Sequence, residues 1–195
     1  MPLDLILAST SPYRRAQVER LGVPFRAVAP PVDEESLKRE WGAIPPRELA
    51  ERLAMAKAEG VARQEPDAVV IGGDQLVASG GSILGKPGTP ERAVEQLMSM
   101  SGRSHELITA LVVIQGGTPY AHTNITRLAL RQLTHEEIRR YVEADCPTDC
   151  AGAYKLEARG IALFDRIDSE DHSAIVGVPM IALTTILRRL GFAIP

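Results

Sequence analysis

The sequence predicts a mixed α/β fold in which helices cover the faces of a twisted central sheet. Short apolar runs typical of buried strands alternate with amphipathic segments of helical period. Several of the amphipathic segments begin at a capping residue and end at glycine. Two long strand-like segments flank the turn "QGGTP", which adds an antiparallel hairpin. Strands that alternate with helices, together with a hairpin, are typical of a mixed sheet with helices on its faces.

The first half of the chain predicts strands and helices in turn. The helix "SPYRRAQVERLG" has Ser11 as its cap, Pro12 at its first position and Gly22 as its stop. The segment "PVDEES" reads as a loop, and the glycines before Asp74 are expected to interrupt a buried strand. The expected strands are 3–9, 25–30 and 67–78, and the expected helices are 11–22, 45–64 and 90–102.

The second half predicts a hairpin, a capped helix, a strand and a closing helix. The segment "THEEIRRYVEAD" carries a capping box from Thr134 to Glu137. The hairpin covers 105–114 and 121–133, the last strand 160–168 and the closing helix 179–191. We expect one domain over 1–195, because 195 residues are typical of a single domain.

The composition and charge of the chain argue against some classes of partner and some cellular locations. The net charge of −3 gives no global field that would hold nucleic acid or an acidic membrane, so an anion site must be local. No apolar run reaches membrane-spanning length, and "MPLDLILAS" lacks the basic start and long apolar stretch of a signal peptide. We therefore expect a cytoplasmic protein without membrane or nucleic-acid partners.

The cysteines and histidines do not predict a metal site. Cys146 and Cys150 are interpreted as reduced, partly buried thiols, with a redox or metal role as the alternative. The four histidines show no metal-ligand spacing and are expected to be structural or surface residues.

The segment "STSPYRR" is a candidate anion site. Free amides at a helix start, the hydroxyls of Ser9 and Ser11 and the guanidinium of Arg14 form a plausible phosphate cradle. A cation in the first turn opposes the helix dipole unless an anion binds there. The alternative is a plain capped helix whose arginines lie in solvent.

Asp74 is a candidate catalytic carboxylate. It lies in the apolar strand "VVIGGDQLV", where aspartate is a poor strand residue and costly to bury unpaired. The glycines before it leave room for a ligand to approach the backbone. The alternative is a turn residue at the end of a strand.

Further charged residues could join a nucleotide site. Asp33 and Glu34 in "PVDEES" suit a magnesium ion that bridges to phosphates, although a solvated acidic loop is the alternative. Lys86, in the stiff loop "GKPGT", could bind phosphate. Lys57 could also bind phosphate or could be a surface lysine whose stem covers apolar surface. Lys155 and Glu157 lie in "CAGAYKLEARG", for which a loop or short helix with ordinary charges is the alternative. Neither a Walker-type loop nor a G-x-S-x-G nucleophile elbow occurs.

The assembled motifs resemble the Maf proteins, which are nucleoside triphosphate pyrophosphatases. The resemblance runs almost end to end and rests on many motifs in the same order: "LILASTSPYRR", "PVDEE", "LAMAKAEGVA", "VIGGDQLV", "LGKPGTPERAVEQLMSMSGRSHELITAL", "EEIRRYVEADCPTDCAGAYKLEARGIALFDRIDSED" and "IVGVPMIAL". It implies a Maf/ITPase-like α/β fold with two lobes flanking a cleft, and usually a homodimer. It also implies a hydrolase that acts on acid anhydrides and cleaves between the α and β phosphates.

The resemblance assigns roles to residues of this chain. Asp74 falls on the family's proton acceptor, and Ser9, Arg14, Lys57 and Lys86 fall on its phosphate-contacting residues. An acidic position falls on Glu34. With Asp74 it is expected to bind the divalent cofactor, magnesium or manganese.

Three positions bear on the choice of base. Members that prefer dTTP and UTP usually have an arginine after "SP", a "DT" pair and a glutamine in the "AG" segment, whereas this chain has Tyr13, Gln75 and Glu157. The resemblance is therefore to the branch that hydrolyses 7-methyl-GTP. An aromatic face attracts the cationic methylated ring, and a carboxylate can accept hydrogen bonds from the guanine edge.

Three alternatives stay open: a dTTP- or UTP-preferring pyrophosphatase of the same family, a non-enzymatic regulator of septum formation, and an RNA-binding protein. The family motif residues favour an enzyme over a regulator. The net charge and an aromatic content of 4% argue against an RNA-stacking surface.

Overall fold

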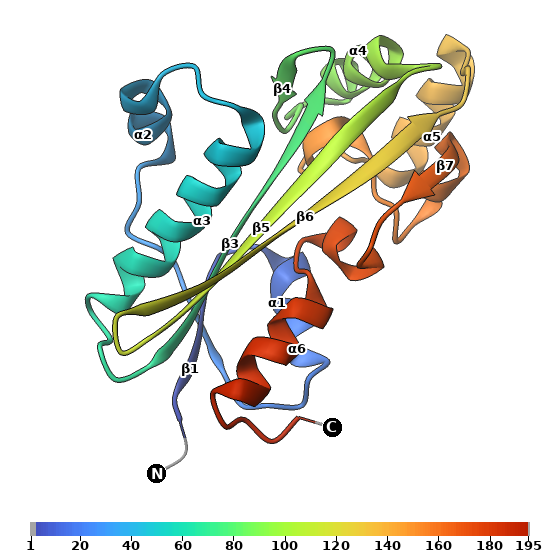
Figure 1. Ribbon diagram of the computed structural model, residues 1–195. Helices are drawn as coiled ribbons and strands as arrows, with labels where there is room; N and C mark the ends of the chain where they lie inside the picture. The colour runs from blue at the N-terminus through green and yellow to red at the C-terminus, as the bar shows by residue number, and fades with distance from the viewer. Residues whose placement is uncertain (1–2, 195) are drawn as a thin grey trace. The chain divides into compact units, whose positions relative to one another are not determined.

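The structure, a computed structural model that describes residues 3–194, is a mixed α/β fold (Figure 1). Its strands have the order β2-β1-β3-β5-β6-β7, with β4 paired to β3. β1 runs parallel to β2 and β3, whereas β4 and β7 run antiparallel to β3 and β6. The fold class predicted from the sequence is therefore confirmed.

The elements have the following bounds. The strands are β1 (Leu5–Ala8), β2 (Arg26–Val28), β3 (Val69–Ser79), β4 (Ser82–Leu84), β5 (Ser104–Gln115), β6 (Thr118–Leu130) and β7 (Phe164–Asp168). The helices are α1 (Pro12–Glu19), α2 (Glu34–Trp41), α3 (Pro46–Ala62), α4 (Pro90–Met100), α5 (His135–Asp145) and α6 (Met180–Arg189). Three 3-10 helices are η1 (Ala151–Ala153), η2 (Arg159–Leu163) and η3 (His172–Val176).

The chain divides into two compact units. Unit 1 comprises Met1–Asp74, Thr109–Asn124 and Asp171–Pro195, and unit 2 comprises Gln75–Ile108 and Ile125–Glu170. The boundaries fall inside β3, β5 and β6, so each of these strands contributes to both units. A single domain over 1–195 and a cleft between lobes stay predictions.

The core of unit 1 follows from the alternation of side chains along β1 and β3. Leu5 and Leu7 pack in one cluster with Val18 of α1 and Leu183 and Leu187 of α6. The intervening residues Ile6 and Ala8 pack in a second cluster that contains Val61 of α3 and Val70 of β3. Successive strand residues point to opposite faces, so both faces of these strands are covered. Figure 1 shows α3 on one side of these strands and α1 with α6 on the other.

Unit 2 is built around helices α4 and α5, which contact each other. Thr89 caps α4. α5 begins with the predicted capping box, in which the Thr134 side chain accepts from the Glu137 amide and the Glu137 carboxylate accepts from the Thr134 amide. Each helix buries one apolar face: Ala93, Leu97 and Met100 on α4, and Ile138, Tyr141 and Val142 on α5.

Four local predictions were wrong. "PVDEES" is not a loop, because Asp33 caps helix α2 and its carboxylate accepts from the Ser36 amide. The glycines 72 and 73 do not interrupt β3, which is continuous. The predicted strand 160–168 is a strand only from Phe164 onward and begins as η2. Cys146 is exposed rather than partly buried.

Within residues 3–194, no helix is long and apolar enough to cross a membrane.

His105 is a buried titratable group in unit 2. Its Nε2 lies 3.0 Å from the Tyr154 hydroxyl, and its ring packs against those of Tyr154 and Phe164. Its Nδ1 is buried without a hydrogen-bond partner among the described residues. Burial lowers the pKa of His105 to about 4, so the imidazole is neutral at pH 7.

We predict that His105 makes stability fall between pH 6.5 and 4. In that range the unfolded chain binds a proton at this site, because its histidine keeps the ordinary pKa, whereas the folded chain does not. The free energy of unfolding therefore drops by about 2 kcal/mol from pH 7 to pH 5 through this group. Urea unfolding at both pH values measures the drop. His105→Gln should reduce it by that amount, and His135→Gln, at an exposed position, should not. An unchanged drop in His105→Gln would contradict the prediction.

We also predict that Gly72→Ala destabilises the protein by about 2 kcal/mol through overpacking. A Cβ at Gly72 would lie 2.6 Å from the Ala54 carbonyl oxygen and 2.7 Å from the Ala58 Cβ, so β3 and α3 would have to move apart. Gly85→Ala is the matched control, because a Cβ there meets nothing within 4 Å. Thermal unfolding of both variants is the measurement, and equal melting temperatures would contradict the prediction.

Candidate active site

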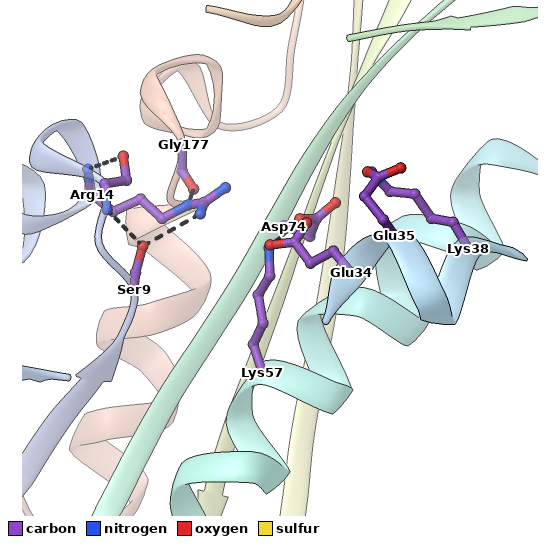
Figure 2. A network of polar contacts seen from close by, with 9 residues as sticks. Ser9, Arg14, Glu34, Glu35, Lys38, Lys57, Asp74 and Gly177 are labelled. Atoms are coloured by element: carbon purple, nitrogen blue, oxygen red, sulfur yellow. Dashed lines mark hydrogen bonds and ion pairs between the residues drawn. The ribbon is translucent and has the colours of Figure 1, made fainter. Parts of the chain in front are cut away.

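A buried ion pair between Lys57 and Asp74 forms the centre of the candidate site in unit 1 (Figure 2). The Lys57 Nζ donates to the Asp74 Oδ1 at 2.7 Å, and both residues are buried. The same Nζ lies 2.9 Å from the Glu34 Oε1. One ammonium group therefore holds two carboxylates.

The local packing explains why Lys57 and Asp74 meet. Gly72 lies against Ala54 and Ala58 of α3, and the lack of a Cβ allows this close approach. Asp74 is two residues further along β3 and so points to the same face as Gly72. Lys57 precedes Ala58 on the buried face of α3. The alternative of a surface lysine is therefore wrong for Lys57.

The environment of Asp74 makes its carboxylate unusually basic. Burial raises the pKa of Asp74, while the charges of Lys57 and Arg14 partly offset the rise and the charge of Glu34 adds to it. The Asp74 Oδ2 is buried and has no hydrogen-bond partner among residues 3–194. A buried carboxylate oxygen without a partner is costly, so this atom is suited to a ligand.

Glu34 comes from the start of α2. Asp33 caps this helix, so Glu34 is its first residue. The neighbouring Glu35 points elsewhere and pairs with Lys38 on the same helix (Figure 2). The Glu34 side chain is 40% exposed, so it links the buried pair to solvent.

Arg14 and Ser9 lie at the junction of β1 and α1. Ser11 caps α1, and its side chain accepts from the Arg14 amide. The Arg14 Nε donates to the Gly177 carbonyl at 3.1 Å, and its Nη1 donates to the Ser9 Oγ at 3.5 Å (Figure 2). The Ser9 Oγ also accepts from the Ser11 amide. Arg14 therefore does not extend into solvent.

The charges of Asp74 and Glu34 explain how a cation is tolerated in the first turn of α1. Burial lowers the pKa of the Arg14 guanidinium, and the charges of Asp74 and Glu34 oppose this. Gly73 points to the other face of β3 from Asp74. A Cβ there would lie 3.3 Å from the Ala110 carbonyl oxygen and 3.6 Å from the Arg14 Nε. The two glycines before Asp74 thus make room for α3 on one face and for Arg14 on the other.

The structure brings together five of the predicted residues, namely Ser9, Arg14, Glu34, Lys57 and Asp74, all of them in unit 1. Tyr13 also belongs to unit 1 and is half-buried in the first turn of α1. Gln75, Lys86 and Glu157 belong to unit 2. Their placement relative to Asp74 beyond the chain connection stays a prediction.

The unit 2 residues have defined local settings. Lys86 is exposed in the loop after β4, whose Gly85 carbonyl accepts from the Gln96 Nε2 at 3.1 Å. The Gly88 amide in the same loop donates to the Thr148 carbonyl. Glu157 is exposed in the turn before η2, and Gln75 is half-buried in β3.

No group of three or more histidine, cysteine, aspartate or glutamate side chains that could hold a metal ion occurs in the part of the chain that the structure describes. Glu34 and Asp74 are two carboxylates on one ammonium, and Asp74 has a buried oxygen without a partner. Magnesium is commonly bound through one or two carboxylates plus substrate phosphates. The residues therefore fit a divalent ion that arrives with a polyphosphate.

Gly177 and Gln17 also belong to the surroundings of the site and were not predicted from the sequence. The Gln17 Nε2 donates to the Ser173 carbonyl at 2.7 Å, one turn along α1 from Arg14. Gly177 lies in "IVGVP" with φ +133°, a conformation that L side chains rarely adopt. The available signal in the sequence was a glycine just before a helix. The contact of Gly177 with Arg14 is made by the backbone carbonyl, which every residue type has, so the residue type does not predict it.

The chain is similar to a known protein family over most of its length. Residues 4–190 match the Maf family, described as Maf-like protein. The structure is also similar to that of the Staphylococcus aureus Ham1 protein, with a TM-score of 0.53 and 11% identity, covering 95% of this chain and 99% of that chain. At that identity the second likeness concerns the fold alone.

Curated relatives cover nearly the whole chain. A Bdellovibrio bacteriovorus protein named 7-methyl-GTP pyrophosphatase is 52% identical over 94% of this chain and 95% of its own length. Proteins of the same name from Xanthomonas axonopodis and Pseudomonas aeruginosa are 49% and 42% identical, each over 98% of this chain and over 98% and 99% of their own lengths. This chain belongs to the Maf family.

Proposed function

We propose that this protein is a nucleoside triphosphate pyrophosphatase that hydrolyses 7-methyl-GTP to 7-methyl-GMP and pyrophosphate. The observation that carries the proposal is the buried Lys57–Asp74 pair, whose Asp74 Oδ2 has no partner among the described residues. Membership of the Maf family and the names of the relatives support the substrate.

Asp74 is the proposed proton acceptor. In the reaction, the oxygen of water bonds to the phosphorus atom under attack, and the bond between that phosphorus and the oxygen that bridges the α and β phosphates breaks. The nucleoside monophosphate and pyrophosphate separate, and one proton of the water goes to a base. The raised pKa of Asp74 favours proton transfer to its carboxylate. Lys57 fixes the orientation of this carboxylate through the bond to Oδ1, which leaves Oδ2 for the water.

Four residues are proposed to hold the phosphates. Arg14 presents a guanidinium at the start of α1, where the Ser9 hydroxyl also favours an anion. Lys57 would neutralise charge close to Asp74, and the exposed Lys86 would add a second ammonium. Donors that are already in place stabilise charge that develops in the transition state.

A divalent cation, magnesium or manganese, is the proposed cofactor, with Glu34 and Asp74 as its protein ligands. The Asp74 carboxylate and the half-exposed Glu34 carboxylate supply the oxygen ligands that such ions prefer. When bound, the ion would offset the negative charge of the polyphosphate.

Tyr13, Gln75 and Glu157 are the proposed base-selecting residues. Tyr13 would stack on the cationic methylated ring, Glu157 would accept from the guanine edge, and Gln75 follows Asp74 in β3. A dTTP- or UTP-preferring enzyme is not favoured, because the relatives at 42–52% identity are named for 7-methyl-GTP. A non-enzymatic regulator is not favoured either, because it would not require the ion pairs around Asp74. Homodimer formation and a cytoplasmic location remain part of the proposal.

Asp74→Asn is expected to lower kcat about 10²–10⁴-fold while the protein stays folded. Asparagine keeps the shape of the side chain and loses the basic carboxylate. The measurement is pyrophosphate release from 7-methyl-GTP at saturating magnesium. Glu35→Gln, on the neighbouring helix position, is the matched control and should retain activity because the Glu35 carboxylate pairs with Lys38 rather than with Lys57. Near-normal kcat in a folded Asp74→Asn protein would refute the assignment.

Removal of divalent ions is expected to abolish turnover. After dialysis against EDTA, the protein should release no pyrophosphate, and added magnesium or manganese should restore the release. The Glu34 and Asp74 carboxylates carry the same negative charge as the polyphosphate and repel it, so the ion is needed for charge balance. Full activity in excess EDTA would rule out the metal proposal.

The base preference tests the proposed substrate. Wild-type kcat/KM should be higher for 7-methyl-GTP than for GTP, dTTP or UTP. A cation–π contact is worth about 0.5–2 kcal/mol, so stacking by Tyr13 gives a modest preference and Glu157 must supply the rest. Tyr13→Arg combined with Glu157→Gln should therefore weaken 7-methyl-GTP hydrolysis far more than dTTP hydrolysis. An equal loss on both substrates would mean that these residues do not select the base.

A further inference from the structure

Gly177 lies against the side chain of Arg14 and accepts a hydrogen bond from it. The Gly177 carbonyl oxygen accepts this bond from the Arg14 Nε at a distance of 3.1 Å. A Cβ on Gly177 would lie 3.2 Å from the Arg14 Cγ and 3.6 Å from its Nε, so only glycine leaves the guanidinium where it is. The backbone φ of +133° adds a second reason for glycine at this position.

The segment that carries Gly177 is held firmly at its base. The Asp171 carboxylate caps η3 by accepting from the Ser173 amide and hydroxyl, and its second oxygen accepts from the Ile181 amide. The Ser173 hydroxyl contacts the Val178 carbonyl at 3.1 Å and accepts from the Met180 amide. These bonds tie both ends of the segment 171–178 to the start of α6.

The segment is also tied to the elements that carry the site. The Thr109 Oγ1 on β5 donates to the Ala174 carbonyl at 2.9 Å, and both groups are buried. The Gln17 Nε2 on α1 donates to the Ser173 carbonyl. Gln17 and Arg14 lie one turn apart on the same helix, so α1 binds the segment at two carbonyl groups, those of Ser173 and Gly177.

We infer that the segment 171–178 is a rigid support for Arg14, and that Gly177 is a positioning residue for binding of the triphosphate. The inference rests on the proposed function in one respect, namely that Arg14 contacts phosphate. The Arg14 Nε is used on the Gly177 carbonyl and one Nη1 hydrogen on the Ser9 Oγ, which orients the planar guanidinium and leaves its remaining N–H groups for an anion. A carbonyl acceptor provides this orientation without adding a negative charge that would repel phosphate.

A double-mutant cycle on Gly177 and Arg14 tests the inference. Gly177→Ala should lower kcat/KM about 10- to 100-fold, because a small displacement of a positioned group has a large effect on rate. Gly177→Ala should lower kcat/KM equally for 7-methyl-GTP and GTP, since both substrates have the same phosphates. In an Arg14→Ala background, which has no Cγ to displace, Gly177→Ala should cost less than about two-fold. Additive losses would overturn the inference.

Gly191→Ala is the matched control for backbone strain. Gly191 also belongs to unit 1 and has φ +92°, but a Cβ there meets nothing within 4 Å. Its kcat/KM should stay within about two-fold of the wild-type value. A loss in Gly191→Ala as large as that in Gly177→Ala would attribute the effect to strain and overturn the inference.

A second pair of variants covers the case in which Gly177→Ala does not fold. Thr109→Val keeps the side-chain shape and removes the bond to the Ala174 carbonyl, whereas Thr109→Ser keeps that bond. Thr109→Val should lower kcat/KM about 3- to 10-fold, and Thr109→Ser should restore most of the loss. No loss in Thr109→Val would overturn the proposed support by the segment.

Binding of inorganic tripolyphosphate with magnesium, measured by calorimetry, separates this inference from the proposed function. If the wild type binds tripolyphosphate but cleaves no nucleotide, the proposed function fails, and the inference holds provided that Gly177→Ala and Arg14→Ala weaken this binding to a similar extent. Unchanged tripolyphosphate binding in Gly177→Ala, or no binding by the wild type, would overturn the inference itself.

Discussion

The buried ion pair of Lys57 and Asp74 is the interaction on which the candidate site depends. Two opposite charges are buried together, and each has the other as its main partner at 2.7 Å. The pair forms because Gly72 lets β3 approach α3 closely and Asp74 follows two residues later on the same face. The packing of unit 1 and the chemistry of the site therefore have the same origin.

The charged side chains around this pair differ in their partners, and this difference makes the site suited to a polyphosphate. Lys57 is shared by Asp74 and Glu34, while Arg14 is held by neutral oxygens of Gly177 and Ser9. Burial works against the charged forms of both Asp74 and Arg14. An anion with a divalent ion would add the missing partners to the Asp74 Oδ2 and to the guanidinium.

Local signals in the sequence were sufficient for much of the fold. Ser11 and Pro12 predicted the start of α1, the Thr134–Glu137 box predicted the start of α5, and apolar runs predicted the strands. Helix α2 was missed because its eight residues bury no side chain, so no apolar period marks it. The strand at 160–168 was placed too early because the apolar residues 161–163 read equally well as strand or as 3-10 helix.

For the candidate site, the sequence indicated which residue types take part but not which side chains contact one another. Asp74 stood out as a carboxylate in an apolar strand, whereas Lys57 could not be told from a surface lysine until α3 was placed against β3. Gly177 gave no usable signal, since its role lies in a backbone carbonyl that meets Arg14 across 163 positions of sequence. Contacts that depend on such long-range packing require the folded chain.

The most direct test of the account is the coupling energy of Lys57 and Asp74 in the free energy of unfolding. Lys57→Met, Asp74→Asn and the double variant would be unfolded in urea beside the wild type. Each single variant leaves a buried charge without its main partner, whereas the double variant does not. The account predicts that the double variant is more stable than the sum of the two single losses by about 2 kcal/mol or more. Additive losses would contradict it.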